Sequence, residues 1–306
     1  MQTALVQHAL LASILEATAT KPGNVHPEAS FEDLTYEDFV RSAVVAAPAF
    51  ENAVERGVGA TVLDAIQRTR DAVGRNTNLG IALVLAPLAA VPAKTPLEEG
   101  IGAVLTNLSV RDAEQVYEAI RLANPGGLGR VDCQDIAEAP SVSLLEAMKL
   151  AAERDQIAAE YASEFSSVFA GAKRLARFEP FAERWEDAIV DLHIWLMAQL
   201  PDTLIARKCG PEVAAEAARY ASSVLSAGGP QSPIGRSRMR YLDTWLRAQL
   251  PPQIVDDCFA KRNRENSVLD AVHLEDFAET RADESAQPII HHGESCALAR
   301  GAAAEV

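Results

Sequence analysis

The sequence predicts an all-α fold, a single multi-helix bundle domain around one central buried helix. The first observation is composition, because 48% of the 306 residues are hydrophobic, only 6% are aromatic, and alanine is abundant. The second is the near absence of period-two runs of Val, Ile, Thr and Tyr, which strands favour. The third is a nearly uncharged segment at residues 81–91 that is too apolar for a surface helix. We expect this segment to be the central helix.

The remaining helices follow from apolar residues at helical spacing, joined by short turns. The segment at residues 35–38 has the Thr-x-x-Asp form of a capping box and predicts a helix start there. His193 is interpreted as a surface histidine of its helix. We expect helices at residues 4–20, 39–47, 52–72, 97–109, 110–123, 143–175, 184–200, 211–225 and 237–250.

The charge and cysteine content restrict the function. A net charge of -15 argues against a nucleic-acid partner, because duplex binding depends on basic side chains that neutralise phosphates. The four cysteines show no CxxC spacing, which favours a reduced, cytoplasmic protein. No uncharged stretch approaches the roughly 18 residues that span a bilayer, so we expect no membrane partner.

The chain changes character near its C-terminus. From Arg264 onwards it carries nine acidic and three basic residues with little apolar periodicity. We therefore assign residues 1–260 to the helical domain and residues 261–306 to a divergent, weakly ordered tail.

A polar stretch opens the expected central helix. Asn76, Thr77 and Asn78 stand between two glycines, of which Gly80 would let a ligand or another helix approach closely. Such side chains cap a helix N-terminus, and the same N-terminus favours anions. Both readings stay open here, a plain cap and a binding site at the mouth of a buried helix.

A turn rich in proline and glycine follows the first helix. Lys21 and His26 are its strongly polar ionisable residues, Gly23 and Asn24 lie between them, and Asp33 follows in the next loop. Two prolines and a glycine stop a helix and force a defined turn, and loops often carry function. A solvated linker is the alternative.

Two later segments could hold phosphate and a cation. The first is the glycine-rich loop at residues 124–135, where backbone N–H groups could cradle phosphate while Asp132 and Asp135 hold a divalent ion. In the second, Asp202 is followed by the basic pair Arg207 and Lys208. The structural alternatives are a helix-to-helix loop and an ordinary cap beside a solvated basic pair.

Taken together, the segments at 21–26, 76–80 and 202–208 resemble the triphosphoribosyl-dephospho-CoA synthase family in the same order along the chain. The similarity runs from about residue 5 to residue 250. The segment at residues 124–135 looks like the version found in members linked to one-carbon metabolism. Three separated motifs are more specific than any one of them.

The resemblance implies a transferase that joins ATP to 3'-dephospho-CoA and releases adenine, with Mg²⁺ as cofactor and a prosthetic-group precursor as product. The reaction is a glycosyl transfer at ribose C1' with an oxocarbenium-like transition state. A homodimer is left open. We expect catalytic roles for His26, Asp33 and Asp202. We expect nucleotide contacts from Lys21, Gly23, Asn24, Asn76, Thr77, Asn78, Gly80, Arg207 and Lys208. We expect the magnesium ligands to be among Asp33, Asp132, Asp135 and Asp202.

The chain departs from the family near its end. Family members usually carry a Pro-Gly motif followed by Ala-Asp-Leu, and residues 262–266 stand in its place here. Two alternatives therefore remain beside the leading reading. One is a related nucleotide-dependent enzyme of one-carbon coenzyme biosynthesis, and the other is a helical protein that binds nucleotide without turnover.

Overall fold

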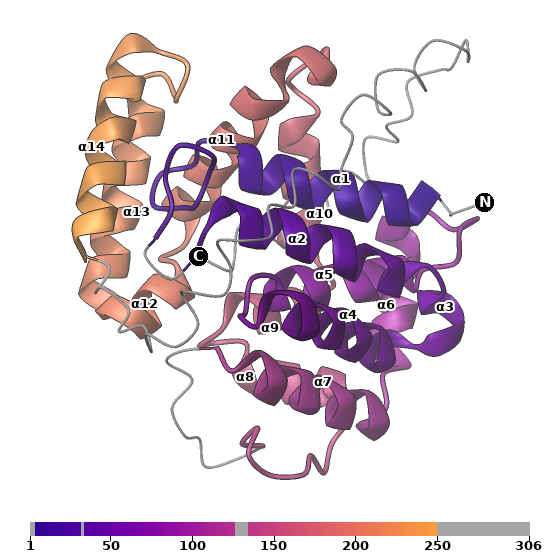
Figure 1. Ribbon diagram of the computed structural model, residues 1–306. Helices are drawn as coiled ribbons and strands as arrows, with labels where there is room; N and C mark the ends of the chain where they lie inside the picture. The colour runs from indigo at the N-terminus through magenta and orange to yellow at the C-terminus, as the bar shows by residue number, and fades with distance from the viewer. Residues whose placement is uncertain (1–3, 32–33, 126–133, 250–306) are drawn as a thin grey trace, which may run out of the picture.

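The computed structural model is all-α, as the composition predicts (Figure 1). It describes residues 4–31, 34–125 and 134–249, so the tail at 261–306 lies outside the described residues. Within these ranges there is no β-sheet, and a single bridge between His26 and Ala29 is the only strand-like pairing. The N-terminal helices are α1 (Ala4–Thr18), α2 (Tyr36–Ala46), the 3-10 helix η1 (Ala47–Phe50), α3 (Ala53–Arg56), α4 (Val58–Val73), α5 (Leu79–Ala89), α6 (Leu97–Thr106) and α7 (Val110–Ala123). The C-terminal helices are α8 (Leu144–Ala151), α9 (Gln156–Ala162), α10 (Ser166–Leu175), α11 (Phe181–Gln199), α12 (Thr203–Cys209), α13 (Pro211–Ser226) and α14 (Pro233–Gln249).

Helix α5 is the central helix, as expected. All its residues are buried, including Pro87 near its C-terminal end. It contributes to a core cluster that also takes residues from α1, α4, α7 and α9. A helix that is apolar on every side can only be stable inside such a bundle, because each face must be covered.

Capping boxes fix where several helices start. Thr35 accepts a hydrogen bond from Asp38 N, and the Asp38 carboxylate accepts one from Thr35 N at 3.0 Å, which confirms the predicted box. Serine forms the same arrangement at the starts of α7 and α8. These side chains satisfy backbone N–H groups that a first turn leaves without partners.

The long helix expected at residues 143–175 is wrong, because the segment forms α8, α9 and α10. Asp155 starts α9 by accepting a hydrogen bond from Ala158 N at 3.0 Å. Glu164 and Phe165 both have left-handed backbone conformations, with φ of 54° and 62°, which end α9 and redirect the chain into α10. The apolar spacing continues across the breaks because all three pieces face the same core.

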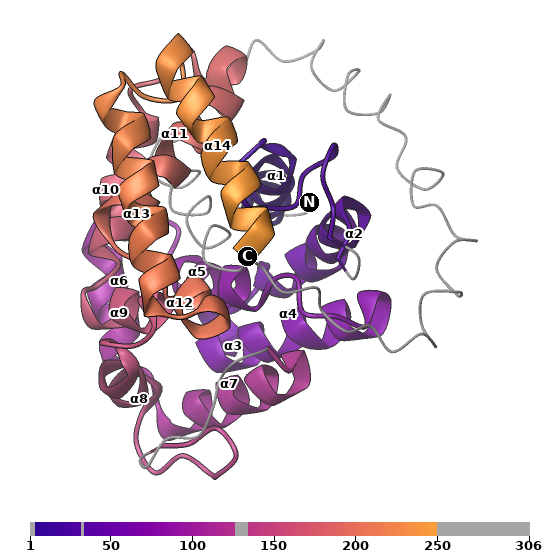
Figure 2. The same ribbon diagram turned by 90° about the vertical axis from the view of Figure 1, so that its left-hand side faces the viewer.

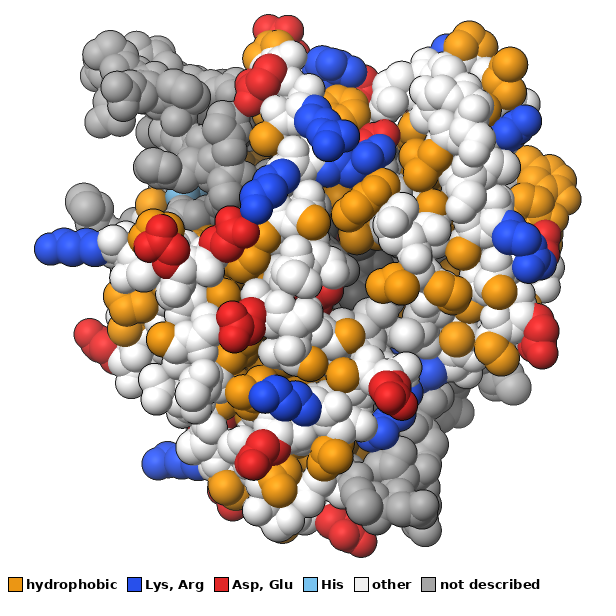
Figure 3. All heavy atoms as spheres, turned by 180° about the vertical axis from the view of Figure 1, so that it is seen from behind, with side chains coloured by type: hydrophobic (Ala, Val, Ile, Leu, Met, Phe, Trp, Pro, Cys, Tyr) orange, Lys and Arg blue, Asp and Glu red, His pale blue; other side chains and the backbone are white. Residues whose placement is uncertain are grey.

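The C-terminal helices form a second packed unit beside α5. Ile194 of α11 packs with Ala217 of α13 and with Leu242 and Leu246 of α14. Figure 2 shows α13 and α14 running alongside each other in front of α11. The back face is hollowed between this column and the rest of the molecule (Figure 3). None of the described helices is long and apolar enough to cross a bilayer.

We predict that Leu85→Ala destabilises the fold by about 2 to 5 kcal/mol, since Leu85 is 1% exposed in the middle of α5 and its loss leaves a cavity. The measurement is chemical unfolding. Leu150→Ala is the matched control, because Leu150 is 55% exposed and its truncation should change stability by less than about 0.5 kcal/mol. Equal effects of the two changes would contradict the central position of α5.

Candidate functional site

The turn after α1 is held by side chains from distant parts of the chain. Gly23 has a φ of 76°, and its N–H donates to Asp243 Oδ1 of α14 at 2.8 Å. The carbonyl of Asn24 accepts from Arg247 of α14 at 2.7 Å. A Cβ on Gly23 would lie 2.9 Å from the Leu246 side chain, so glycine is needed for both conformation and space. The turn is therefore a junction between α1 and α14.

Lys21 lies inside this junction. Its side chain is 1% exposed, and its ammonium group donates to both the carboxylate and the backbone carbonyl of Glu16, itself buried near the end of α1. Burial lowers the pKa of Lys21, and the Glu16 charge opposes the shift. The structure therefore gives Lys21 a partner within the protein, and a contact with triphosphate stays a prediction.

His193 of α11 is buried, so its interpretation as a surface histidine is wrong. Its Nε2 lies 3.2 Å from the carbonyl oxygen of Pro22 in the turn. Burial lowers the pKa of His193 to about 3, and the nearby charge of Lys21 acts in the same direction. The ring is therefore neutral near pH 7. Because a carbonyl only accepts, Nε2 carries the proton and Nδ1 is left as an acceptor.

The second predicted segment, at 202–208, forms a short helix close to the same place. Asp202 caps α12 by accepting hydrogen bonds from Leu204 N at 2.7 Å and Ile205 N at 2.9 Å. Burial raises the pKa of Asp202, although these hydrogen bonds oppose the shift. Arg207 donates to Asp155 at 2.6 Å, while its Nε is buried with no hydrogen-bond partner. Lys208 is partly exposed.

Two cavities meet at this point. One has a volume of about 390 Å³ and the other of about 20 Å³, and His193, Met197 and Asp202 line both of them. The small cavity is also lined by Pro22, Gly23 and Asn24. Asn24 Nδ2 is buried there without a hydrogen-bond partner, so it is a donor that a ligand oxygen could satisfy. Residues 22–24 of the turn and Asp202 and Ile205 of the second segment thus line adjoining cavities, whereas Lys21, Arg207 and Lys208 line neither of them.

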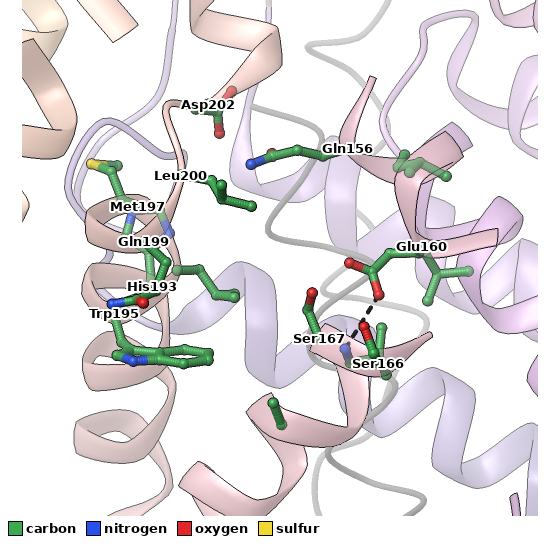
Figure 4. A pocket seen from close by; sticks show the side chains of 15 residues that line it. Gln156, Glu160, Ser166, Ser167, His193, Trp195, Met197, Gln199, Leu200 and Asp202 are labelled. Carbon is green, nitrogen blue, oxygen red and sulfur yellow. Dashed lines mark hydrogen bonds between the residues drawn. The ribbon is translucent and has the colours of Figure 1, made fainter. Parts of the chain in front are cut away.

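The larger cavity is walled by elements that no sequence motif indicated. Gln156 and Glu160 come from α9, Ser166 and Ser167 from α10, and Trp195 from α11 (Figure 4). Glu160 is 6% exposed, and its Oε2 accepts from Val168 N at 3.3 Å. Two residues with left-handed backbone, Glu164 and Phe165, precede this wall. Glu and Phe do not favour a positive φ, so the sequence gives no sign of this feature. These residues are therefore found only in the tertiary structure.

The stretch at 76–78 lies elsewhere in the fold. Thr77 is hydrogen-bonded to Ser42 of α2, and Asn78 Nδ2 donates to Thr69 of α4 at 2.8 Å. Asn78 is the N-cap of α5 but makes no side-chain cap hydrogen bond, and the first N–H of the helix, on Leu79, donates instead to Asn76 Oδ1 at 3.2 Å. The cavity beside Thr77 and Asn78 has a volume of about 10 Å³, room for about one water molecule. These contacts join α5 to α2 and α4, and Gly80 lies buried in the first turn of α5.

Among the other predicted residues that the structure describes, His26 and Asp135 line neither cavity. His26 is partly buried, and its Nδ1 accepts from Glu28 N at 3.3 Å. Burial, assisted by the Arg247 charge, lowers its pKa. Asp135 accepts from Ala137 N at 2.9 Å in the loop between α7 and α8 and lines neither cavity. Asp33 and Asp132 lie outside the described residues.

The described residues hold no cluster of three or more His, Cys, Asp or Glu that could bind a metal by itself. Magnesium usually binds through one or two carboxylates together with substrate phosphates. Asp202 uses Oδ1 to cap α12, so its second carboxylate oxygen fits an ion that arrives bound to a nucleotide. Both roles of Asp202, as ligand and as catalytic residue, stay predictions.

We predict that Lys21→Met destabilises the protein by about 3 to 5 kcal/mol, because it leaves the Glu16 carboxylate buried without its partner. Adding Glu16→Leu should recover much of the loss in urea unfolding. Lys173→Met is the control, since its pair with Glu98 is exposed and worth at most about 1 kcal/mol. Equal losses for Lys21→Met and Lys173→Met would show that the buried pair does not hold the turn.

We predict that His193 makes stability fall on mild acidification. Its folded pKa of about 3 lies below the ordinary value of 6.5, so between these values the unfolded chain binds more protons. Stability is therefore lost as the pH falls through 6.5 towards 3, by roughly 2 kcal/mol between pH 7 and pH 5. His193→Gln should remove this component from urea unfolding measured at the two pH values. An equal loss of unfolding free energy between pH 7 and pH 5 in the wild type and in His193→Gln would contradict the neutral, buried state of the His193 ring.

Comparison with known proteins identifies the family of the chain. The sequence model of the CitG family, described as ATP:dephospho-CoA triphosphoribosyl transferase, matches residues 2–250. A crystal structure from Archaeoglobus fulgidus, assigned to a triphosphoribosyl-dephospho-CoA synthase, aligns with a TM-score of 0.54 and 27% sequence identity, covering 69% of this chain and 89% of that one. No curated protein gives a significant match. The chain therefore belongs to the CitG family of ATP:dephospho-CoA triphosphoribosyl transferases.

Proposed function

We propose that this transferase binds ATP and 3'-dephospho-CoA at the two connected cavities and joins them with release of adenine. One observation supports placing the substrates at these cavities. Residues 22–24 and the residues Asp202 and Ile205 are about 180 residues apart in the chain, yet they line the same cavity beside His193. We also propose a cytoplasmic location, which agrees with the free Cys209 and with the substrates.

The reaction exchanges one bond at ribose C1' for another. The C1'–N9 bond to adenine breaks, an acceptor hydroxyl oxygen forms the new bond, and the hydroxyl proton is delivered to the departing adenine. Positive charge develops on the ribose in the transition state, and nearby carboxylates stabilise it. Asp202 is such a carboxylate, because it lines both cavities.

The neutral imidazole of His193 is suited to positioning the acceptor hydroxyl. The hydrogen bond between Nε2 and the Pro22 carbonyl fixes the ring, and Nδ1 can accept a hydrogen bond from a substrate O–H. Asn24 Nδ2 supplies a donor in the adjoining small cavity. A donor and an acceptor side by side would orient a ribose without adding charge.

Cations for the triphosphate come from α12. The Arg207 guanidinium is held by Asp155 and keeps Nε without a protein partner, and Lys208 follows it on the same helix. Arginine suits phosphate because it can donate two parallel hydrogen bonds. We propose that the nucleotide brings Mg²⁺, which would offset the phosphate charge, and that Asp202 provides one of its oxygen ligands.

We predict that Asp202→Asn lowers Mg²⁺-dependent ATP affinity at least tenfold, equal to about 1.4 kcal/mol, with little change in melting temperature. Asparagine caps helices about as well as aspartate, so the substitution removes the charge and keeps the start of α12. The measurements are calorimetric ATP binding with and without Mg²⁺, and adenine release from ATP with and without dephospho-CoA.

Glu146→Gln is the matched control, because Glu146 belongs to the exposed capping box of α8 and should leave ATP binding unchanged. Unchanged ATP affinity in Asp202→Asn would remove Asp202 from the metal site. Adenine release from ATP that another acceptor stimulates and dephospho-CoA does not would keep the chemistry and change the acceptor. The absence of any adenine release would leave a nucleotide-binding protein.

A further inference from the structure

The larger cavity has a buried floor and an open mouth. Buried residues from α5, α9, α10 and α11 form the floor, namely Val84, Glu160, Val168, His193 and Met197. Gln199, Leu200 and Ser166 are exposed and stand at the mouth. A volume of about 390 Å³ falls in the range of small-molecule sites. The cavity can therefore take a compact group from solvent and enclose it.

Charge decides which part of a nucleotide can enter. Two carboxylates, Glu160 and Asp202, line the cavity, and none of the described residues that line it is Lys or Arg. A triphosphate beside Glu160 would be desolvated next to negative charge with no Lys or Arg on the cavity wall to compensate, which is strongly unfavourable. Asp202, the proposed Mg²⁺ ligand, lines both this cavity and the smaller one, and the cations Arg207 and Lys208 lie on α12 and do not line the cavity. The wall around Glu160 therefore disfavours an anionic occupant.

The polar groups on the wall select an uncharged occupant that can donate hydrogen bonds. A carboxylate only accepts, its two oxygens together can accept about four hydrogen bonds, and Val168 N donates one to Glu160 Oε2. In Figure 4 the Glu160 carboxylate points into the cavity, towards the side where Leu200 and Gln156 lie. Gln156 adds an amide that both donates and accepts. This combination suits the edge of a nitrogen heterocycle.

An aromatic side chain completes the wall. Trp195 lines the cavity, and the guanidinium carbon of Arg174 lies 5.4 Å from the centre of its ring. Arg174 is itself fixed by Asp191, with the Nε to Oδ2 distance at 2.6 Å. Aromatic faces bind nucleobases by stacking, and a fixed ring loses little freedom when it does so.

The backbone holds Glu160 in place for this role. Phe165 N donates to the Glu160 carbonyl at 2.8 Å, and the left-handed conformations of Glu164 and Phe165 bring the start of α10 back against α9. Val168 N can then reach the Glu160 carboxylate. Unfavourable backbone conformations of this kind persist where the surrounding structure imposes them, often at ligand sites.

We propose that the larger cavity binds the adenine ring of a nucleotide substrate, with Glu160 accepting hydrogen bonds from its exocyclic amino group and Trp195 packing against the base. The assignment rests on the proposed function and deepens it, because it places the base in the cavity and the phosphates outside it, near α12. Both ATP and dephospho-CoA contain adenine, so either substrate can supply the base that occupies the cavity.

The test is equilibrium dialysis of the full chain with free adenine and with purine, which lacks the 6-amino group. We expect adenine to bind at least about tenfold more tightly than purine, because hydrogen bonds to a charged acceptor are strong. Glu160→Gln should reduce this selectivity severalfold or more, while purine affinity changes little. Glu118→Gln, an exposed position of α7 outside the cavities, is the matched control and should keep the selectivity.

Competition identifies the source of the base. ATP or dephospho-CoA is added to protein loaded with labelled adenine, and the substrate that displaces it is the one whose base occupies the cavity. Equal binding of adenine and purine by the wild type, unchanged selectivity in folded Glu160→Gln, or adenine that neither substrate displaces would each overturn the assignment. If Glu160→Gln fails to fold, Trp195→Ala provides the second test, since weaker binding of both bases is expected and unchanged binding would overturn the proposal.

The result is separable from the proposed function. Selective adenine binding that a substrate displaces, without adenine release under any condition, would support the cavity assignment and refute the transfer reaction. Adenine release that continues with normal affinity in Glu160→Gln would support the transfer reaction and refute the assignment.

Discussion

The buried ion pair between Lys21 and Glu16 is the constraint on which the site depends. Removing two charges from water is unfavourable, and such a pair is tolerated only when its geometry satisfies both groups. Here the ammonium binds the carboxylate and carbonyl of the same residue, which closes the turn after α1 tightly. The turn can then present its own backbone groups to His193, Asp243 and Arg247. The pair thus supports the contacts of α11 and α14 with the end of α1, together with the hydrogen bonds from Thr20 to Glu186 of α11.

The same pair influences the chemistry of the site. The positive charge of Lys21 disfavours a proton on His193, and burial disfavours it further. A neutral histidine therefore stands between the turn and the cavities, where it can accept a hydrogen bond without attracting phosphate. In the binding mode that we propose, the carboxylates of Glu160 and Asp202 face the base and the cations of α12 face the phosphates. Helix packing sets this arrangement, because Glu160 comes from α9, His193 from α11, and Asp202 and the cations from the start and body of α12.

Local patterns predicted much of the fold. The all-α class followed from composition, α5 from its apolar run, and the start of α2 from the pair Thr35 and Asp38. The boundaries of the helices followed less directly from local patterns. The segment at 143–175 looked continuous because its apolar residues all face one core, and the two left-handed residues that divide it, Glu164 and Phe165, are not of the types that favour this conformation. Tertiary packing imposed those angles against local preference.

Local patterns were enough to predict the family, the helical class and two segments that contribute to the candidate site, around 22–24 and 202–205, since capping residues, prolines and glycines act over a few neighbouring positions. Which polar groups share a space depended on the fold of the whole chain. It buried Lys21 against Glu16, attached Thr77 and Asn78 to α2 and α4, and brought His193 and Glu160 to one cavity. The physical reason is that burial, charge pairing and pKa depend on neighbours brought together by helix packing. Residues as far apart as Pro22 and His193 have no local pattern that could reveal their contact.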